Sequence, residues 1–78
     1  MLFLFYNIDF QKLTGNDLIN AEKEARNLGD KTPTVLLSMA YQASIVAKVI
    51  KVPIDDVLFL PANDFKKLIL PAATFLLD

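Results

Sequence analysis

The first ten residues are hydrophobic except for Asn7 and Asp9, and these two alternate with Tyr6, Ile8 and Phe10 with the period of two that is typical of a β-strand. We therefore predict a strand over residues 3–10, with Asn7 and Asp9 towards water. Later segments show no second strand pattern, so the backbone N–H and C=O groups of this strand need a partner from elsewhere. The core-facing side of the strand comprises Leu4, Tyr6, Ile8 and Phe10.

After residue 12 the pattern changes to a helical period. Thr14, followed three residues later by Asp17, resembles a capping box and predicts a helix that begins near Gly15 or Asn16. Gly29 suits the left-handed residue that closes such a helix. The small residues on its apolar side should allow close approach to a neighbour. That side comprises Leu18, Ala21, Ala25 and Leu28.

A second helix is predicted to begin at Pro33, and its segment over residues 34–51 is apolar almost all round. Thr32 is expected as its N-cap and Pro33 as its first helical residue. A helix of this kind lies at the centre of a fold. Because the rest of so short a chain offers little to cover it, we expect other chains to contribute to the covering.

Prolines divide the remaining sequence into two helices. Pro53 ends the second helix, because the residue before a proline avoids the helical conformation. Residues 53–58 form a short helix with Asp55 and Asp56 at its positive end. The last helix is expected over residues 62–77, with a kink at Pro71. Its core side comprises Phe65, Leu68, Ile69, Ala72 and Leu76.

These elements predict a mainly α protein, a small helical domain of three main helices plus one short helix, preceded by one N-terminal β-strand. We assign one domain to residues 1–78, with the strand segment over 1–12 and the helical part over 13–78. A chain of 78 residues buries only about 60% of its unfolded surface. Since 54% of the residues are hydrophobic, we expect a homo-oligomer or a bound partner. The expected contact surface comprises Leu4, Tyr6, Ile8, Phe10, Tyr41, Ile45, Phe59 and Phe75.

Composition argues against most site chemistry. The chain has no cysteine and no histidine, which removes thiolate catalysis, histidine base catalysis and the usual zinc sites. Asp55 and Asp56 do not face each other on a helix and have no third ligand nearby. We therefore expect no catalytic residue, no metal and no cofactor, and a protein that is not an enzyme.

Charge and hydropathy point away from nucleic acid and membrane partners. The net charge is −1, and the basic residues are dispersed. The longest apolar stretches fall short of the ~20 residues that a membrane-spanning helix requires, and residues 1–6 lack the basic flank of a signal peptide. We expect a cytoplasmic protein. Residues 47–70 imitate the spacing of a helix-turn-helix DNA reader, but acidic and apolar residues occupy the reading helix.

Two long segments resemble a known family. FYNIDFQKLTGNDLINAEKEARNLGD and AYQASIVAKVIKVPIDDVLFLPANDFKKL are similar to the small tail assembly chaperones of long-tailed bacteriophages and prophages, above all those of Gram-positive hosts. The resemblance runs from about Phe5 to the C-terminus. Its most specific parts are LTGNDLINAEKEAR and VAKVIKVPIDDVLFLPANDF, in that order.

The resemblance implies a non-enzymatic role in the cytoplasm of the bacterial host. Such chaperones bind the tape measure protein while tail tube protein polymerises around it, and they are absent from the mature virion. Relatives carry a longer N-terminal region, in which FYNIDFQKL is the second arm of a β-hairpin. The missing arm implies either that another subunit supplies it or that this is a shortened copy. A prophage interaction module without a client, and a DNA-binding regulator, remain the alternatives.

Overall fold

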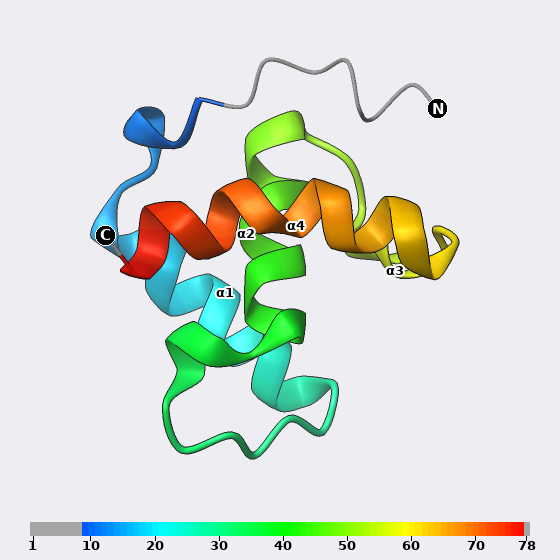
Figure 1. Cartoon of the computed structure of the whole chain (residues 1–78). Coiled ribbons are helices and arrows are strands. Elements are labelled where there is room, and N and C mark those ends of the chain that lie inside the picture. Colours follow the sequence, from blue (N-terminus) through cyan, green and yellow to red (C-terminus); the bar gives the residue numbers. More distant parts are fainter. Residues whose placement is uncertain (1–8, 78) are drawn as a thin grey trace.

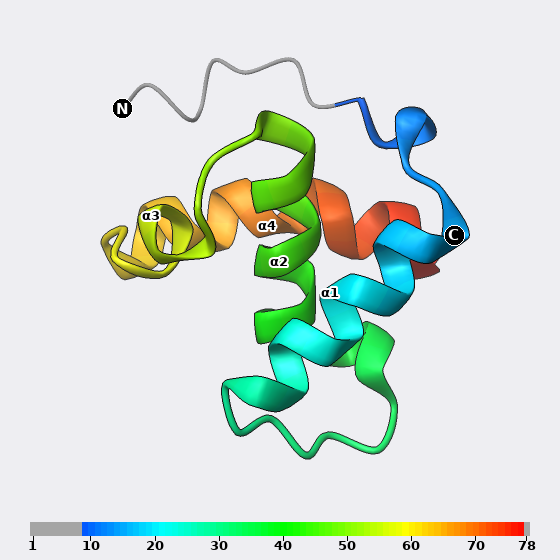
Figure 2. The same cartoon turned by 180° about the vertical axis from the view of Figure 1, so that it is seen from behind.

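Helix α2 (Met39–Ile50) runs through the middle of the fold, and the other helices pack around it (Figure 1). The computed structural model describes residues 9–77. Helix α4 (Ala62–Leu77) crosses in front of α2 in Figure 1 and behind it in Figure 2, whereas α1 (Gly15–Asn27) lies on the opposite side. The short helix α3 (Ile54–Leu58) connects α2 to α4. The mainly helical prediction is thus confirmed.

The predicted N-terminal strand falls largely outside the described residues. Its last residue, Phe10, begins a 3-10 turn, η2 (Phe10–Lys12), rather than continuing an extended segment. Asp9 caps this turn, because its Oδ1 accepts a hydrogen bond from the N–H of Gln11 at 3.0 Å. The side chain of Phe10 is buried and that of Asp9 is exposed, the sides that the alternation predicts for them.

Helix α1 begins and ends as its local signals predict. Thr14 and Asp17 form a reciprocal capping box, in which Thr14 Oγ1 accepts from the Asp17 N–H at 3.3 Å and Asp17 Oδ2 accepts from the Thr14 N–H at 2.9 Å. Gly29 follows the helix with φ +95°. Ala21 and Ala25 are fully buried, whereas Leu28, just past the last helical residue, is exposed.

The predicted start of the second helix is wrong. Thr32 does not cap it: the hydroxyl and the N–H of Thr32 both donate to Asp30 Oδ1 in a local turn, and no α-helix begins directly after Thr32. A 3-10 turn, η3 (Val35–Leu37), follows, and α2 starts only after Ser38. Ser38 Oγ accepts from the Tyr41 N–H at 3.1 Å and so caps the helix.

The centre of α2 is as buried as predicted, because all of residues 41–47 are buried. The covering, however, comes from α1, α3, α4 and η3 of the same chain. Ser44, which is fully buried, donates its hydroxyl to the carboxylate of Glu24 on α1. Small side chains such as Ala43 and Ala47 let the neighbouring helices approach α2 closely. The buried centre of α2 therefore gives no reason to invoke another chain.

The last two helices match their predicted positions. Helix α2 ends at Lys51, which adopts the left-handed conformation (φ 61°), and Pro53 is the N-cap of α3. Helix α4 continues through Pro71, and its buried residues are Leu68, Ile69 and Ala72. The core thus consists of one side of α1, the centre of α2, one side of α4, and the side chains of Phe10 and Val57.

Candidate functional site

Two of the predicted contact residues lie in the core at the centre of α2. Tyr41 and Ile45 belong to the buried centre of α2, so their side chains face the interior of this fold. Burial raises the pKa of the Tyr41 hydroxyl, and the charge of Glu22 adds to this effect. The apolar pattern of α2 does not distinguish a residue buried by its own chain from one buried by a partner. Leu4, Tyr6 and Ile8 lie outside the described residues.

The other three predicted contact residues are placed differently. Phe10 is buried and its ring stacks on that of Phe75, which is 38% exposed. Phe59, at the C-cap of α3, is 86% exposed. Phe59 is therefore the predicted contact residue most available to a partner within residues 9–77.

Some apolar side chains outside the predicted contact surface are exposed as well. Leu70 and Leu77 on α4 are 64% and 56% exposed. They are seven residues apart, about two helical turns, and so share the outer side of α4. The helical period could have identified this pair, because both residues fall outside the predicted core side. Ile19, Leu28, Leu37 and Met39 are exposed on other parts of the fold.

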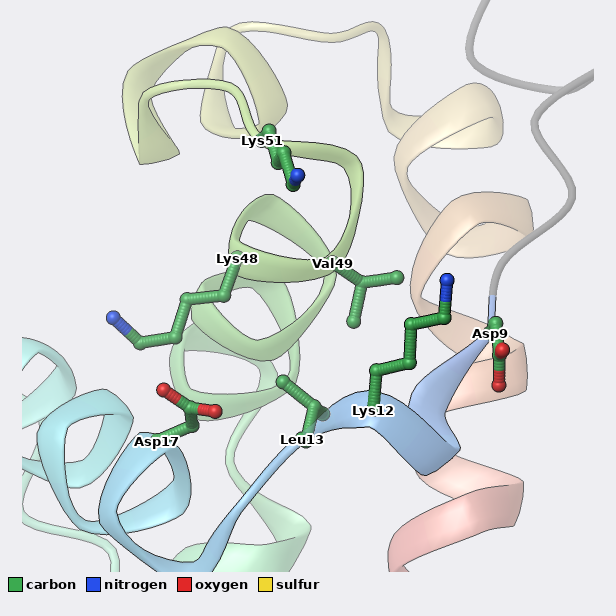
Figure 3. Close-up of a pocket in the computed structure, with 7 residues that line it drawn as sticks. All are labelled: Asp9, Lys12, Leu13, Asp17, Lys48, Val49 and Lys51. Carbon is green, nitrogen blue, oxygen red and sulfur yellow. The ribbon is translucent and has the colours of Figure 1, made fainter.

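A pocket of about 320 Å³ opens between the N-terminal segment and the second half of α2 (Figure 3). It joins residues near positions 9–17 to residues at 48–51. Because these segments meet only in the folded chain, the sequence carried no local signal for the pocket. The lining residues are Asp9, Lys12, Leu13, Asp17, Lys48, Val49 and Lys51.

The two carboxylates of this pocket, those of Asp9 and Asp17, accept hydrogen bonds from backbone N–H groups. Asp9 accepts from the Gln11 N–H, and Asp17 Oδ2 accepts from both the N–H and the hydroxyl of Thr14. Across residues 9–77, the pair Glu22–Arg26 at 3.6 Å is the only ion pair within 4.0 Å. The three lysines of the pocket therefore make no contact ion pair within this part of the chain.

Asp30 organises the connection between α1 and α2. Hydrogen bonds from the Ser38 hydroxyl, then from the hydroxyl and N–H of Thr32, lower the pKa of the Asp30 carboxyl from 3.8 to about 2. Arg26 Nη1 donates to the carbonyls of Asp30 (3.2 Å) and Thr32 (2.8 Å). Every partner of Asp30 is a residue of this connection or of the helix ends beside it, so its role is structural.

The adjacent aspartates of α3 are placed as its first turn predicts. Asp55 and Asp56 are both exposed in the first turn of α3. In the described part of the chain, no three side chains of the Asp, Glu, His and Cys types gather as metal ligands. None of the helices there has the length and apolar character needed to cross a membrane.

The surface of residues 9–77 thus carries exposed apolar side chains and a pocket lined by three lysines. Comparisons with protein families, with curated proteins and with solved structures find no match to this chain.

Proposed function

We propose that this protein is a tail assembly chaperone of the kind found in long-tailed phages and prophages. In this proposal it binds the tape measure protein transiently, by hydrophobic contact and without catalysis, and does not remain in the mature virion. The observation that carries the proposal is the exposure of Phe59, Leu70 and Leu77. Apolar side chains left on the outside of a small fold are suited to cover the apolar side of a client helix.

The sequence resemblance adds support from a different direction. Its first specific part, residues 13–26, comprises the cap and most of α1. Its second, residues 46–65, runs from the second half of α2 through α3 into α4. Phe59 lies inside this second part. The resemblance therefore covers segments that form the core as well as one of the exposed apolar residues.

Co-expression with the tape measure protein of the same phage or prophage tests the proposal. We expect the chain to increase the soluble fraction of the tape measure protein. The combined change Phe59→Ser, Leu70→Ser and Leu77→Ser should abolish this effect while the circular dichroism spectrum stays helical. The control Asn63→Ser with Lys67→Ser changes exposed polar positions of α4 and should keep the effect.

Two results would contradict the proposed function. One is a tape measure protein that stays insoluble at every level of the wild-type chain. The other is a triple variant that protects the client as well as the wild type does. Mass spectrometry of purified virions provides a further check, because a chaperone should be missing from them.

We also propose that the protein forms homo-oligomers and that tail tube protein is a second partner. The same exposed side chains support self-association, because burial of apolar surface between copies is favourable. Sedimentation equilibrium at micromolar concentration should give a mass well above the 8.7 kDa of one chain. A folded species of 8.7 kDa at all concentrations would contradict self-association.

A further inference from the structure

Lysines are concentrated at one place in a chain that has no surplus of basic residues. The protein has eight lysine and arginine residues against nine acidic ones. Three of the eight, Lys12, Lys48 and Lys51, line the pocket described above. Their gathering therefore reflects the way the chain folds and not a general positive charge.

The pocket has an apolar floor and a basic rim. In Figure 3, Val49 lies in the middle, with Leu13 below it, Lys48 to the left, Lys12 to the right and Lys51 above. With two aspartates in the lining, the formal charge of the pocket is three minus two, or +1. Both carboxylates already accept backbone hydrogen bonds, whereas the ammonium groups form no contact ion pair with the described residues.

Stabilisation of the end of α2 explains the positions of only two of the three pocket lysines. Lys48 and Lys51 lie at the C-terminus of α2, where positive side chains are favoured by the helix dipole. Lys12 belongs to a different element, η2, so the dipole of α2 does not explain why a lysine stands at this position. Lys51 also has φ 61°, a conformation in which glycine would avoid the steric cost of a side chain.

The lining residues favour a carboxylate ligand over a phosphate. Lysine ammonium groups are mobile point charges, whereas rigid phosphate sites use arginine forks or nests of backbone N–H groups. The pocket is also at the small end of the range for organic ligands, roughly 300–1,000 Å³. An acidic side chain next to an apolar one matches the basic rim and the floor of Leu13 and Val49.

We propose that this pocket binds an acidic segment of a protein partner. Acidic side chains of the partner lie beside Lys12, Lys48 and Lys51, which point in different directions in Figure 3, and a neighbouring apolar side chain of the partner packs on Val49. Since Lys12 and Lys51 are exposed and Lys48 is partly exposed, their charges contribute mainly to the rate and specificity of association, and salt weakens this contribution. The proposal does not depend on the proposed chaperone function.

The test is a titration of the full ¹⁵N-labelled chain with a capped peptide of alternating glutamate and leucine, followed by NMR. We expect the shift changes to concentrate at the pocket residues. The combined change Lys12→Gln, Lys48→Gln and Lys51→Gln should weaken binding by about tenfold, because three exposed charge contacts are removed. The control Lys23→Gln, Lys66→Gln and Lys67→Gln removes three exposed lysines elsewhere and should leave the affinity unchanged.

Three outcomes would overturn the proposal. The matched glutamine–leucine peptide could bind as tightly as the glutamate–leucine peptide, which would show that the contact is purely apolar. The control variant could lose as much affinity as the pocket variant, which would indicate a non-specific charge effect. Inorganic phosphate could occupy the pocket more tightly than the peptide, which would assign the lysines to a phosphate ligand.

Discussion

The ring of Phe10 stacks on the ring of Phe75, with centroids 5.1 Å apart and planes inclined by 16°. This contact joins the first turn of the described chain to the last turns of α4. Phe10 is almost fully buried by it, whereas Phe75 keeps one side open to solvent. The two ends of the described chain are thus held together by an aromatic pair.

The stack should be measurable as a coupling energy. Phe10→Ala should lower the free energy of unfolding by about 3 kcal/mol, and Phe75→Ala, being partly exposed, by about 1–2 kcal/mol. The double variant should lose about 0.5–1.5 kcal/mol less than the sum, because the pair is then removed only once. Urea denaturation of the four proteins gives this value. Strict additivity would show that the rings are not coupled.

Two leucines of α4 provide a matched test of its orientation. Leu68 is 2% exposed and Leu70 is 64% exposed. Leu68→Ala should cost about 2–5 kcal/mol, because it leaves a cavity in the core. Leu70→Ala should change the stability of the isolated chain by less than about 0.5 kcal/mol, measured by chemical denaturation at a concentration too low for self-association. Equal losses under these conditions would mean that its own chain covers Leu70.

The close contact of α1 with α2 depends on small residues. Ala25 has no exposed surface, so Ala25→Leu should force the helices apart and cost about 1–3 kcal/mol. Lys23→Leu makes a similar side chain at an exposed position of the same helix and serves as the control. Thermal unfolding should rank Ala25→Leu well below Lys23→Leu. The reverse order would mean that Lys23, and not Ala25, lies on the side of α1 that packs against α2.

The network around Asp30 predicts a loss of stability in acid. Its pKa is lowered to about 2 in the folded chain from an ordinary value of 3.8, so its contribution is complete above pH ~4. It is lost as the pH falls from about 4 to about 2. Asp30→Asn should be less stable than the wild type at pH 6, and this difference should shrink by pH 2. The control Asp56→Asn changes an exposed aspartate outside this network and should lose less stability at pH 6 than Asp30→Asn, as measured by urea midpoints.

Lys51 adopts a backbone conformation that suits glycine better. Because a left-handed residue with a side chain costs about 1–2 kcal/mol, Lys51→Gly should raise the free energy of unfolding by about 0.5–1 kcal/mol after the entropy cost of glycine. The same variant should bind the acidic peptide less well. A fall in stability in urea denaturation would show that the Lys51 side chain itself stabilises the end of α2.

Local signals in the sequence were sufficient for most helix boundaries. The capping box of Thr14 and Asp17, the left-handed Gly29 and the N-cap Pro53 act within a few residues of the ends that they define. Because such interactions form between neighbours in the chain, their outcome can be predicted without knowing the fold. The buried side of α4 follows from its period for the same reason, and the burial of α2 follows from its composition.

Tertiary contacts decided the rest. Thr32, directly before a proline, is a residue type that often caps helices. In the structure it instead forms hydrogen bonds with Asp30, and Ser38 caps α2. Whether Tyr41 and Ile45 face a partner or the core of their own chain depended on how closely α1 and α4 could approach α2, which periodicity does not encode. The lysine pocket exists because residues 9–17 pack beside residues 48–51. Contacts between segments this far apart in the chain are set by the packing of the whole fold, and no local pattern records them.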